Sequence, residues 1–169
     1  MKKILILPFF LISFGLFSTF VLGCSCVTAE ASEKDPAKMR TVLRDYYLNE
    51  FTGAIFTGSV DEIKQVKTNI DKDFYTMENE VVISVEKYWI GVKTQKVTLR
   101  TGIGGGDCGV QYDLKKRYFF FAQYIKGMLK TGICDYDSKY SMSADGPSVS
   151  AYDEILGPAK SFPPISGTK

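Results

Sequence analysis

Four cysteines, at positions 24, 26, 108 and 134, are the residues of this chain best suited to chemistry. Only Ser25 separates Cys24 from Cys26, so in an extended chain both thiols point to one side and the serine to the other. Such a pair can anchor a chain end by two bonds or hold a metal ion. The sequence contains no histidine, which excludes histidine-based catalysis and histidine metal ligands.

The segment before Cys24 has the pattern of an export signal. Residues 1–23 begin with two lysines after the initial methionine and continue as an uncharged, mostly apolar run. Val21 and Gly23 occupy the positions where a signal peptidase prefers small residues. We therefore expect a signal peptide over residues 1–23 and a secreted or cell-envelope protein. Retention of the leader as a membrane anchor is the alternative, because the run is long enough to span a bilayer.

The mature chain would be electrically balanced. From Cys24 onward it carries equal numbers of acidic and basic side chains and no run of basic residues. This balance argues against a nucleic-acid partner. The length predicts one domain, which we place at residues 24–157, followed by a flexible C-terminal tail over 158–169.

An even number of cysteines in an exported chain predicts two disulfides. A bond between Cys24 and Cys26 would close a strained ring. The start of the mature chain is therefore expected to be tied twice to the distant region of Cys108 and Cys134, in either of two pairings. Zinc binding by reduced cysteines is the less favoured alternative, because structural zinc sites use two closely spaced pairs.

Two helices are predicted at the ends of the domain. Glu33–Glu50 has helical apolar spacing, with Ser32 as the N-cap. Its apolar stripe is expected to pack on a sheet, and a short helix is expected over Ser150–Leu156. The stripe consists of Met39, Val42, Leu43, Tyr46 and Tyr47.

Between the helices, two-residue alternation and turn residues predict five strands. They cover residues 53–66, 74–91, 93–102, 117–125 and 128–134. Strands do not alternate with helices, which argues against a parallel α/β sheet. The fold class is therefore mainly β with flanking helices, as a five-stranded Greek-key barrel of the OB type. A two-sheet sandwich is the alternative.

The fourth strand, RYFFFAQYI, carries aromatic residues on both faces: Phe119 and Phe121 on one, and Tyr118, Phe120 and Tyr124 on the other. Such a strand must be covered on both sides. One face would fill the barrel, and the first helix or a C-terminal segment would cover the other.

No motif indicates an enzyme, a cofactor or a small-molecule substrate. The glycine-rich stretch GIGGGDCG lacks the spacing and context of a phosphate-binding loop, and we expect a flexible connector that lets Cys108 reach its partner. The acidic pairs Asp71/Asp73 and Asp135/Asp137 lie in turns and are expected to be solvated. General acid–base chemistry is therefore unsupported.

Several segments together resemble the tissue inhibitors of metalloproteinases and the wider netrin-like group of OB-fold modules, in a bacterial-type, single-domain form. They occur in the order CSCV, IFTGSVDEI, CGVQY and KRYFFFAQYIKGMLKTGIC. The resemblance covers Cys24 to about Leu156. Its most specific element is the N-terminal Cys-x-Cys, followed by Cys-Gly at 108–109.

The resemblance implies a protease inhibitor with two disulfides, Cys24–Cys108 and Cys26–Cys134. The amine and carbonyl oxygen of Cys24 would chelate the catalytic zinc of a partner metalloprotease, and Ser25 would enter its specificity pocket. The implied contact residues are Cys24, Ser25, Cys26, Val27, Gly106, Asp107 and Cys108.

An alternative function follows from the leader. The sequence VLGC at 21–24 is similar to a bacterial lipoprotein cleavage box, and lipidation would block both the thiol and the amine of Cys24. The family's third disulfide is also missing. The alternative is a non-inhibitory, envelope-associated interaction module whose disulfides are structural only, with a membrane contact only if Cys24 is lipidated or the leader is retained.

Overall fold

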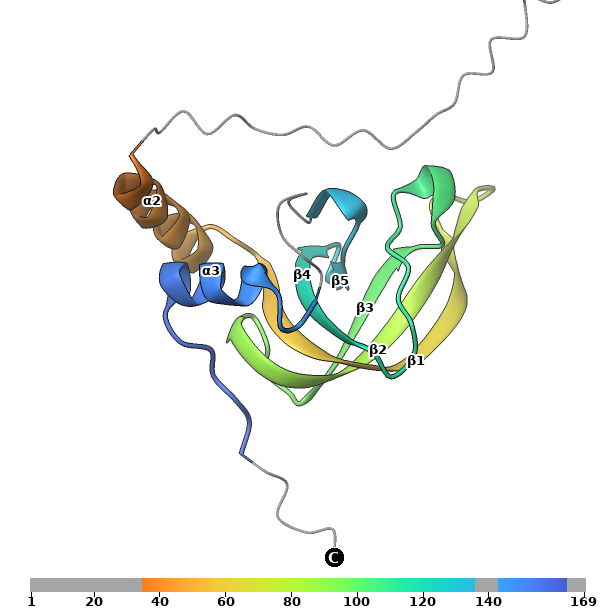
Figure 1. The fold of residues 1–169 in the computed structure, drawn as a ribbon. Helices are drawn as coiled ribbons and strands as arrows, with labels where there is room; N and C mark the ends of the chain where they lie inside the picture. The colour runs from red at the N-terminus through yellow and green to blue at the C-terminus, as the bar shows by residue number, and fades with distance from the viewer. Residues whose placement is uncertain (1–34, 136–142, 164–169) are drawn as a thin grey trace, which may run out of the picture.

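The computed structural model describes residues 35–135 and 143–163 (Figure 1). In this part of the chain, one helix precedes five strands and another follows them. The elements are α2 (Pro36–Asn49), β1 (Gly53–Asn69), β2 (Tyr75–Ile90), β3 (Lys96–Gly102), β4 (Arg117–Ile125), β5 (Met128–Lys130) and α3 (Pro147–Leu156). Two 3₁₀ turns, η1 (Gly105–Asp107) and η2 (Ile133–Asp135), follow β3 and β5.

The five strands form one mixed sheet that closes in a ring, in the order β1-β2-β3-β5-β4, with β4 pairing back to β1. All pairs are antiparallel except β3 with β5. This confirms the mainly-β class, the five strands and a helix on either side of them. Three strand ends were wrong by three residues or more: the first strand ends at Asn69 and not at 66, the third begins at Lys96 and not at 93, and the fifth ends at Lys130 and not at 134, because Ile133–Asp135 turns as η2.

Alternation along the strands places one set of apolar side chains inside the ring. Val81 and Ile83 of β2 and Leu99 of β3 are fully buried, as their two-residue spacing predicted. Phe56 of β1 and Phe120 of β4 stack at 4.9 Å between ring centroids. These residues form the main core.

The outer face of β4 carries a second core, which confirms that both faces of this strand are covered. Phe119 and Phe121 pack there with Ile55 and Trp89. Helix α3 covers them mainly through Tyr152, whose ring stacks on Phe119 at 5.2 Å. The C-terminal helix therefore supplies most of the cover that the sequence required.

Helix α2 begins later and packs differently than expected. Its N-cap is Asp35, whose carboxylate accepts a hydrogen bond from the Ala37 backbone N–H at 2.9 Å; the predicted cap, Ser32, lies outside the described residues. No α2 residue is buried, and Val42 and Tyr46 of the predicted stripe are exposed. The stripe does not pack flat on the sheet, because α3 occupies that position.

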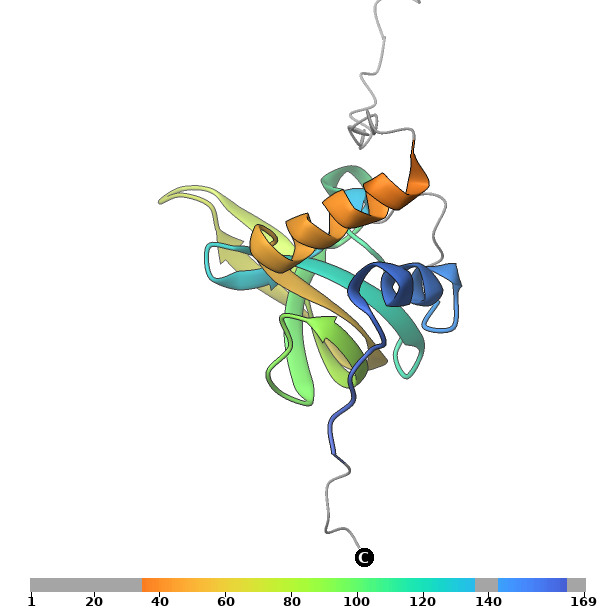
Figure 2. The same cartoon turned by 90° about the vertical axis from the view of Figure 1, so that its left-hand side faces the viewer.

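Instead, α2 lies beside α3, as Figures 1 and 2 both show. The hydroxyls of Tyr47 and Tyr152 are 3.1 Å apart, and Arg40 forms an ion pair with Glu154 at 3.2 Å. The Tyr47 ring also reaches Phe121 of the sheet, with 6.1 Å between ring centroids. Contact between α2 and the sheet is thus confined to the C-terminal end of the helix.

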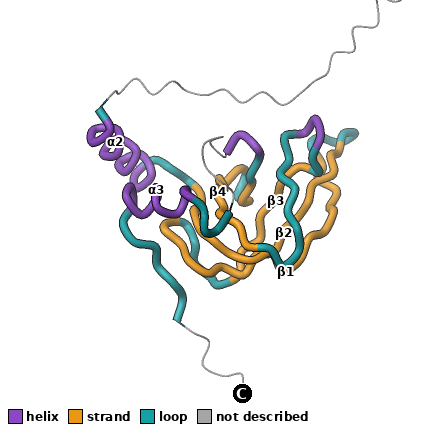
Figure 3. Tube along the Cα trace, in the orientation of Figure 1, coloured by secondary structure: helices purple, strands orange, loops and turns teal. Residues whose placement is uncertain are grey.

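The described part of the C-terminal region makes more contacts with the sheet than its composition indicated. Helix α3 starts at Pro147, three residues before the predicted start. Lys160 lies in the stretch predicted as a tail, yet its backbone exchanges two hydrogen bonds with Tyr88 of β2, at 2.9 and 2.8 Å. The Phe162 ring stacks on Tyr88. Figure 3 shows this segment leaving α3 as a loop.

Candidate functional site

The structure brings the Cys108 and Cys134 segments together, although 26 positions separate them in the sequence. The backbone N–H of Ile133 donates a hydrogen bond to the carbonyl oxygen of Cys108 at 2.9 Å. Neither cysteine is a free thiol. Their predicted partners, Cys24 and Cys26, lie outside the described residues, as do Ser25, Val27 and the leader. The disulfide pairing therefore stays a prediction. Cys108 and Cys134, the two described members of the predicted bonds, lie in neighbouring turns.

The glycine-rich loop that carries Cys108 is braced, which corrects the expectation of a flexible connector. The carboxylate of Asp107 accepts hydrogen bonds from the backbone N–H groups of Ile103, Gly104 and Gly109, at 2.7, 2.9 and 3.0 Å. Burial by itself would raise the pKa of Asp107, but these three bonds outweigh it and hold the pKa below its ordinary value. The carboxylate predicted as a contact group is therefore mainly a brace for its own loop.

Glycine is required where this loop crosses β3. A Cβ atom on Gly109 would lie 2.2 Å from the carbonyl carbon and oxygen of Gly102, which is backbone and cannot move aside. The close approach brings Cys108 against the end of β3. Gly106 and Asp107, both predicted contact residues, are exposed.

A second carboxylate braces the Cys134 turn. Asp135 accepts hydrogen bonds from the backbone N–H of Gly132 at 2.6 Å and from the side-chain amide of Gln123 at 3.2 Å. It is half-buried, and burial raises its pKa above the ordinary value. The expectation of a solvated turn residue was wrong here, because β4 shields one side of η2. It holds for Asp71 and Asp73, which are exposed, whereas Asp137 lies outside the described residues.

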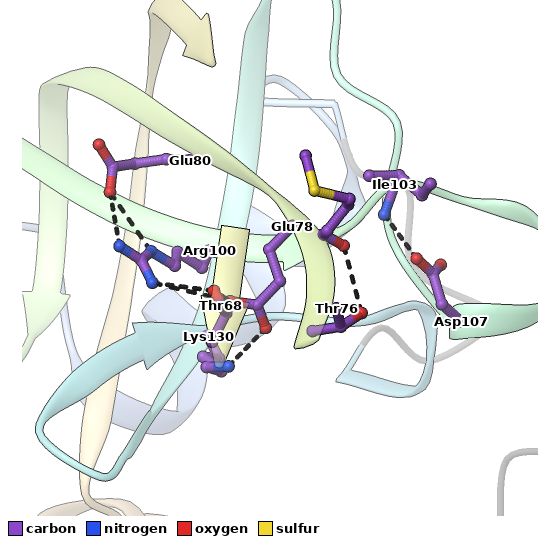
Figure 4. A network of polar contacts seen from close by, with 9 residues as sticks. Thr68, Thr76, Glu78, Glu80, Arg100, Ile103, Asp107 and Lys130 are labelled. Carbon is purple, nitrogen blue, oxygen red and sulfur yellow. Dashed lines mark hydrogen bonds and ion pairs between the residues drawn. The ribbon is translucent and has the colours of Figure 1, made fainter. Parts of the chain in front are cut away.

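A hollow of about 270 Å³ lies between the two cysteine-bearing turns and the β3–β5 seam. Glu78, Arg100 and Lys130 line this hollow and belong to a polar cluster (Figure 4). Glu78 of β2 accepts hydrogen bonds from Lys130 at 2.5 Å and from Thr68 at 2.8 Å. Arg100 of β3 binds Glu80 at 3.1 Å and the Thr68 hydroxyl at 3.1 Å. The two cations and two carboxylates compensate each other.

This cluster closes the ring where backbone pairing is weakest, because β3 and β5 pair only at Arg100 and Lys130. Burial alone would raise the pKa of Glu78, but its hydrogen bonds with Lys130 and Thr68 outweigh this and lower it. Sequence reasoning missed the cluster. The only signal was a set of charged residues on the outer positions of neighbouring strands, and strand register was needed to pair them.

Comparison with known proteins gave no match: no protein-family model matches the chain, and no curated protein is significantly similar to it in sequence. Within residues 35–135 and 143–163, no helix is long and apolar enough to cross a membrane. In the same part of the chain, no three side chains of the metal-binding types gather into a possible metal site.

Proposed function

We propose that this protein is an exported inhibitor of zinc metalloproteases, acting through the amine and carbonyl oxygen of Cys24. After leader cleavage, disulfides from Cys24 to Cys108 and from Cys26 to Cys134 would fix the new chain end. Its amine and carbonyl oxygen would then both bind a partner's catalytic zinc, which has one open position and can expand to five-coordinate, and Ser25 would enter the neighbouring specificity pocket. The α-amino group has a pKa near 8, so its neutral, donating form is accessible.

The juxtaposition of Cys108 and Cys134 is the observation that carries this proposal. In an extended chain, the thiols of Cys24 and Cys26 would point to the same side. Both could then form disulfides at once only with two sulfurs that lie close to each other. The hydrogen bond from Ile133 to Cys108 supports such an arrangement. The carboxylate braces at Asp107 and Asp135 hold both attachment points, so little conformational entropy would be lost on binding a protease.

We infer further that the ring is an OB-type Greek-key barrel. Five strands, the order β1-β2-β3-β5-β4 and closure through β4 and β1 support this assignment. The long connection from β3 across to β4, which carries η1 and Cys108, accounts for the parallel pairing of β3 with β5.

The test compares two chains that differ only at the terminus: one beginning at Cys24, and one with an added alanine before Cys24. Both are assayed against a panel of purified zinc endopeptidases with fluorogenic peptides. We expect the first chain to inhibit at least one protease and the extra residue to weaken inhibition at least 100-fold, because it removes the amine from the zinc. Thermal stability should be nearly equal. Equal inhibition by both chains would refute chelation.

Mass spectrometry of the exported product separates this proposal from the lipoprotein alternative. A free Cys24 amine with two disulfides is required for chelation. An acylated N-terminus would leave a non-inhibitory, envelope-associated interaction module, with the same barrel and no zinc-binding amine.

A further inference from the structure

A second hollow opens at the other end of the β3–β5 seam from the cysteine-bearing turns. Its volume is about 330 Å³, within the range of small ligand sites. One wall is β3, from Lys96 to Arg100, and the other is the β4–β5 hairpin, including Tyr124 and Met128. It exists because β5 pairs with β3 only at Arg100, so the earlier half of β3 lacks a neighbour on this side among the described residues.

The hydrogen-bonding direction of β3 shows which backbone groups face this hollow. The carbonyl oxygen of Arg100 accepts a bond from Thr131 N–H of the β5 side at 3.0 Å, whereas that of Gln95 accepts from Val85 of β2 at 2.8 Å. Even-numbered residues of β3 therefore direct their backbone groups toward β5. Thr98 lies two residues before Arg100, and the β3–β5 pairing does not reach it. Its N–H and C=O face the hollow as an open strand edge.

The charged side chains around this edge have an excess of positive charge. Arg100 is compensated by Glu80 at 3.1 Å. Lys96 is largely exposed and forms an ion pair at 3.5 Å with Asp61, which also pairs with Lys115. Lys93 forms no ion pair within the described residues. The ring of side chains thus complements a negatively charged ligand, while the edge complements an extended backbone.

We propose that this hollow binds a short, extended, acidic peptide segment of a partner protein, which adds to the Thr98 edge of β3. Strand addition of this kind uses backbone hydrogen bonds for affinity and side-chain contacts for selectivity. The open edge runs from Lys96 to Thr98, because Arg100 is paired with β5, and spans about 7 Å at ~3.3 Å per residue, which accommodates about two to three residues. The acidic side chains would contact Lys93 and Lys96. This site lies at the other end of the β3–β5 seam from the Cys108 and Cys134 turns, so we expect it to act independently of protease inhibition.

The test uses the chain from residue 24 and a fluorescein-labelled peptide, Val-Glu-Val-Glu-Val, in fluorescence anisotropy, with Val-Lys-Val-Lys-Val as the charge control. We expect only the acidic peptide to bind. Thr98→Pro removes the N–H that faces the hollow and leaves the β2–β3 ladder intact, and it should weaken binding at least 10-fold. Thr98→Ala keeps the backbone and should change binding less than about twofold. Charge reversal of Lys93 and Lys96 should also weaken binding.

A second measurement keeps the proposal testable if Thr98→Pro does not fold. The acidic peptide is N-methylated at alternate residues, in each of the two registers, and tested against the unchanged protein. One register should lose binding, because only one set of amides faces the β3 edge. Binding that survives both N-methylated registers, equal binding of the lysine peptide, or no binding of the acidic peptide at about 1 mM would overturn the proposal.

Discussion

The two carboxylates that brace the cysteine-bearing turns should respond in opposite ways to the same substitution. Asp107 has three backbone N–H donors on its two oxygens, and hydrogen bonding holds its pKa low. Asp135 has one backbone donor and one amide donor, and burial holds its pKa high. Replacing each by asparagine removes the charge and one acceptor oxygen, with almost no change in shape.

For Asp107→Asn, the amide nitrogen must face at least one backbone N–H group. The arrangement of lowest cost leaves Ile103 N–H without its acceptor and removes the charge from the bonds with Gly104 and Gly109. Hydrogen bonds to charged groups contribute about 1.5–3 kcal/mol to stability. Because water can hydrogen-bond the freed groups of an exposed loop, we expect the free energy of unfolding to fall by about 1.5 kcal/mol. The melting temperature should fall by roughly 5–8 °C.

For Asp135→Asn, the asparagine oxygen can still accept from Gly132, and no charge has to be kept in the half-buried position. We expect stability at pH 7 to be unchanged or slightly higher. The pH dependence gives a second, sharper comparison. Because the folded pKa of Asp107 is depressed, its contribution is present at neutral pH and is lost as pH falls through the folded value, below the ordinary 3.8.

The sign is reversed for Asp135, whose folded pKa is raised. The folded state binds the Asp135 proton more tightly than the unfolded state does. Protonation of Asp135 therefore stabilises the fold as pH falls through the raised pKa, and the ionised carboxylate lowers stability above that pKa. Urea unfolding between pH 7 and pH 3 would measure both variants. Equal losses for the two asparagine variants at pH 7, or no loss for Asp107→Asn, would refute the assignment of Asp107 as the structural brace.

Three further predictions concern the ring and its helices. Glu78→Gln should cost about 2 kcal/mol at pH 7 in urea unfolding, less than the 3–5 kcal/mol for a fully buried pair because Lys130 keeps contact with water. The depressed pKa of Glu78 means that this difference should shrink as pH falls below its ordinary 4.5; a constant difference would contradict the pairing. Phe120→Ala removes a fully buried ring and should cost about 3–5 kcal/mol by thermal unfolding, and a loss below 1 kcal/mol would place Phe120 outside the core. Tyr47→Ala should speed amide hydrogen exchange in α2 and leave the strands protected, because this helix reaches the sheet through Tyr47; unchanged exchange in α2 would mean that other contacts hold it.

The sequence by itself determined the elements, because their signals are local. The alternation of Val81, Ile83 and Val85 specified a strand with one buried face. Gly53 marked the start of the first strand, and Gly91 follows the end of the second. The aromatic residues on both faces of β4 required two covering layers, and the structure has both. The helix around residues 36–49 also followed from spacing, although its cap did not.

The candidate site depended on contacts between distant segments, which only the tertiary structure decides. The adjacency of Cys108 and Cys134 requires β5 to lie beside β3, and no local pattern specifies that neighbour. The pairing of Glu78 with Lys130 and the burial of Asp135 follow from the same closure. Helix α2 lost its expected place on the sheet because α3, from the other end of the chain, buries its apolar side there. Periodicity specifies which face of an element is apolar, but the partner of that face is chosen by packing across the whole chain.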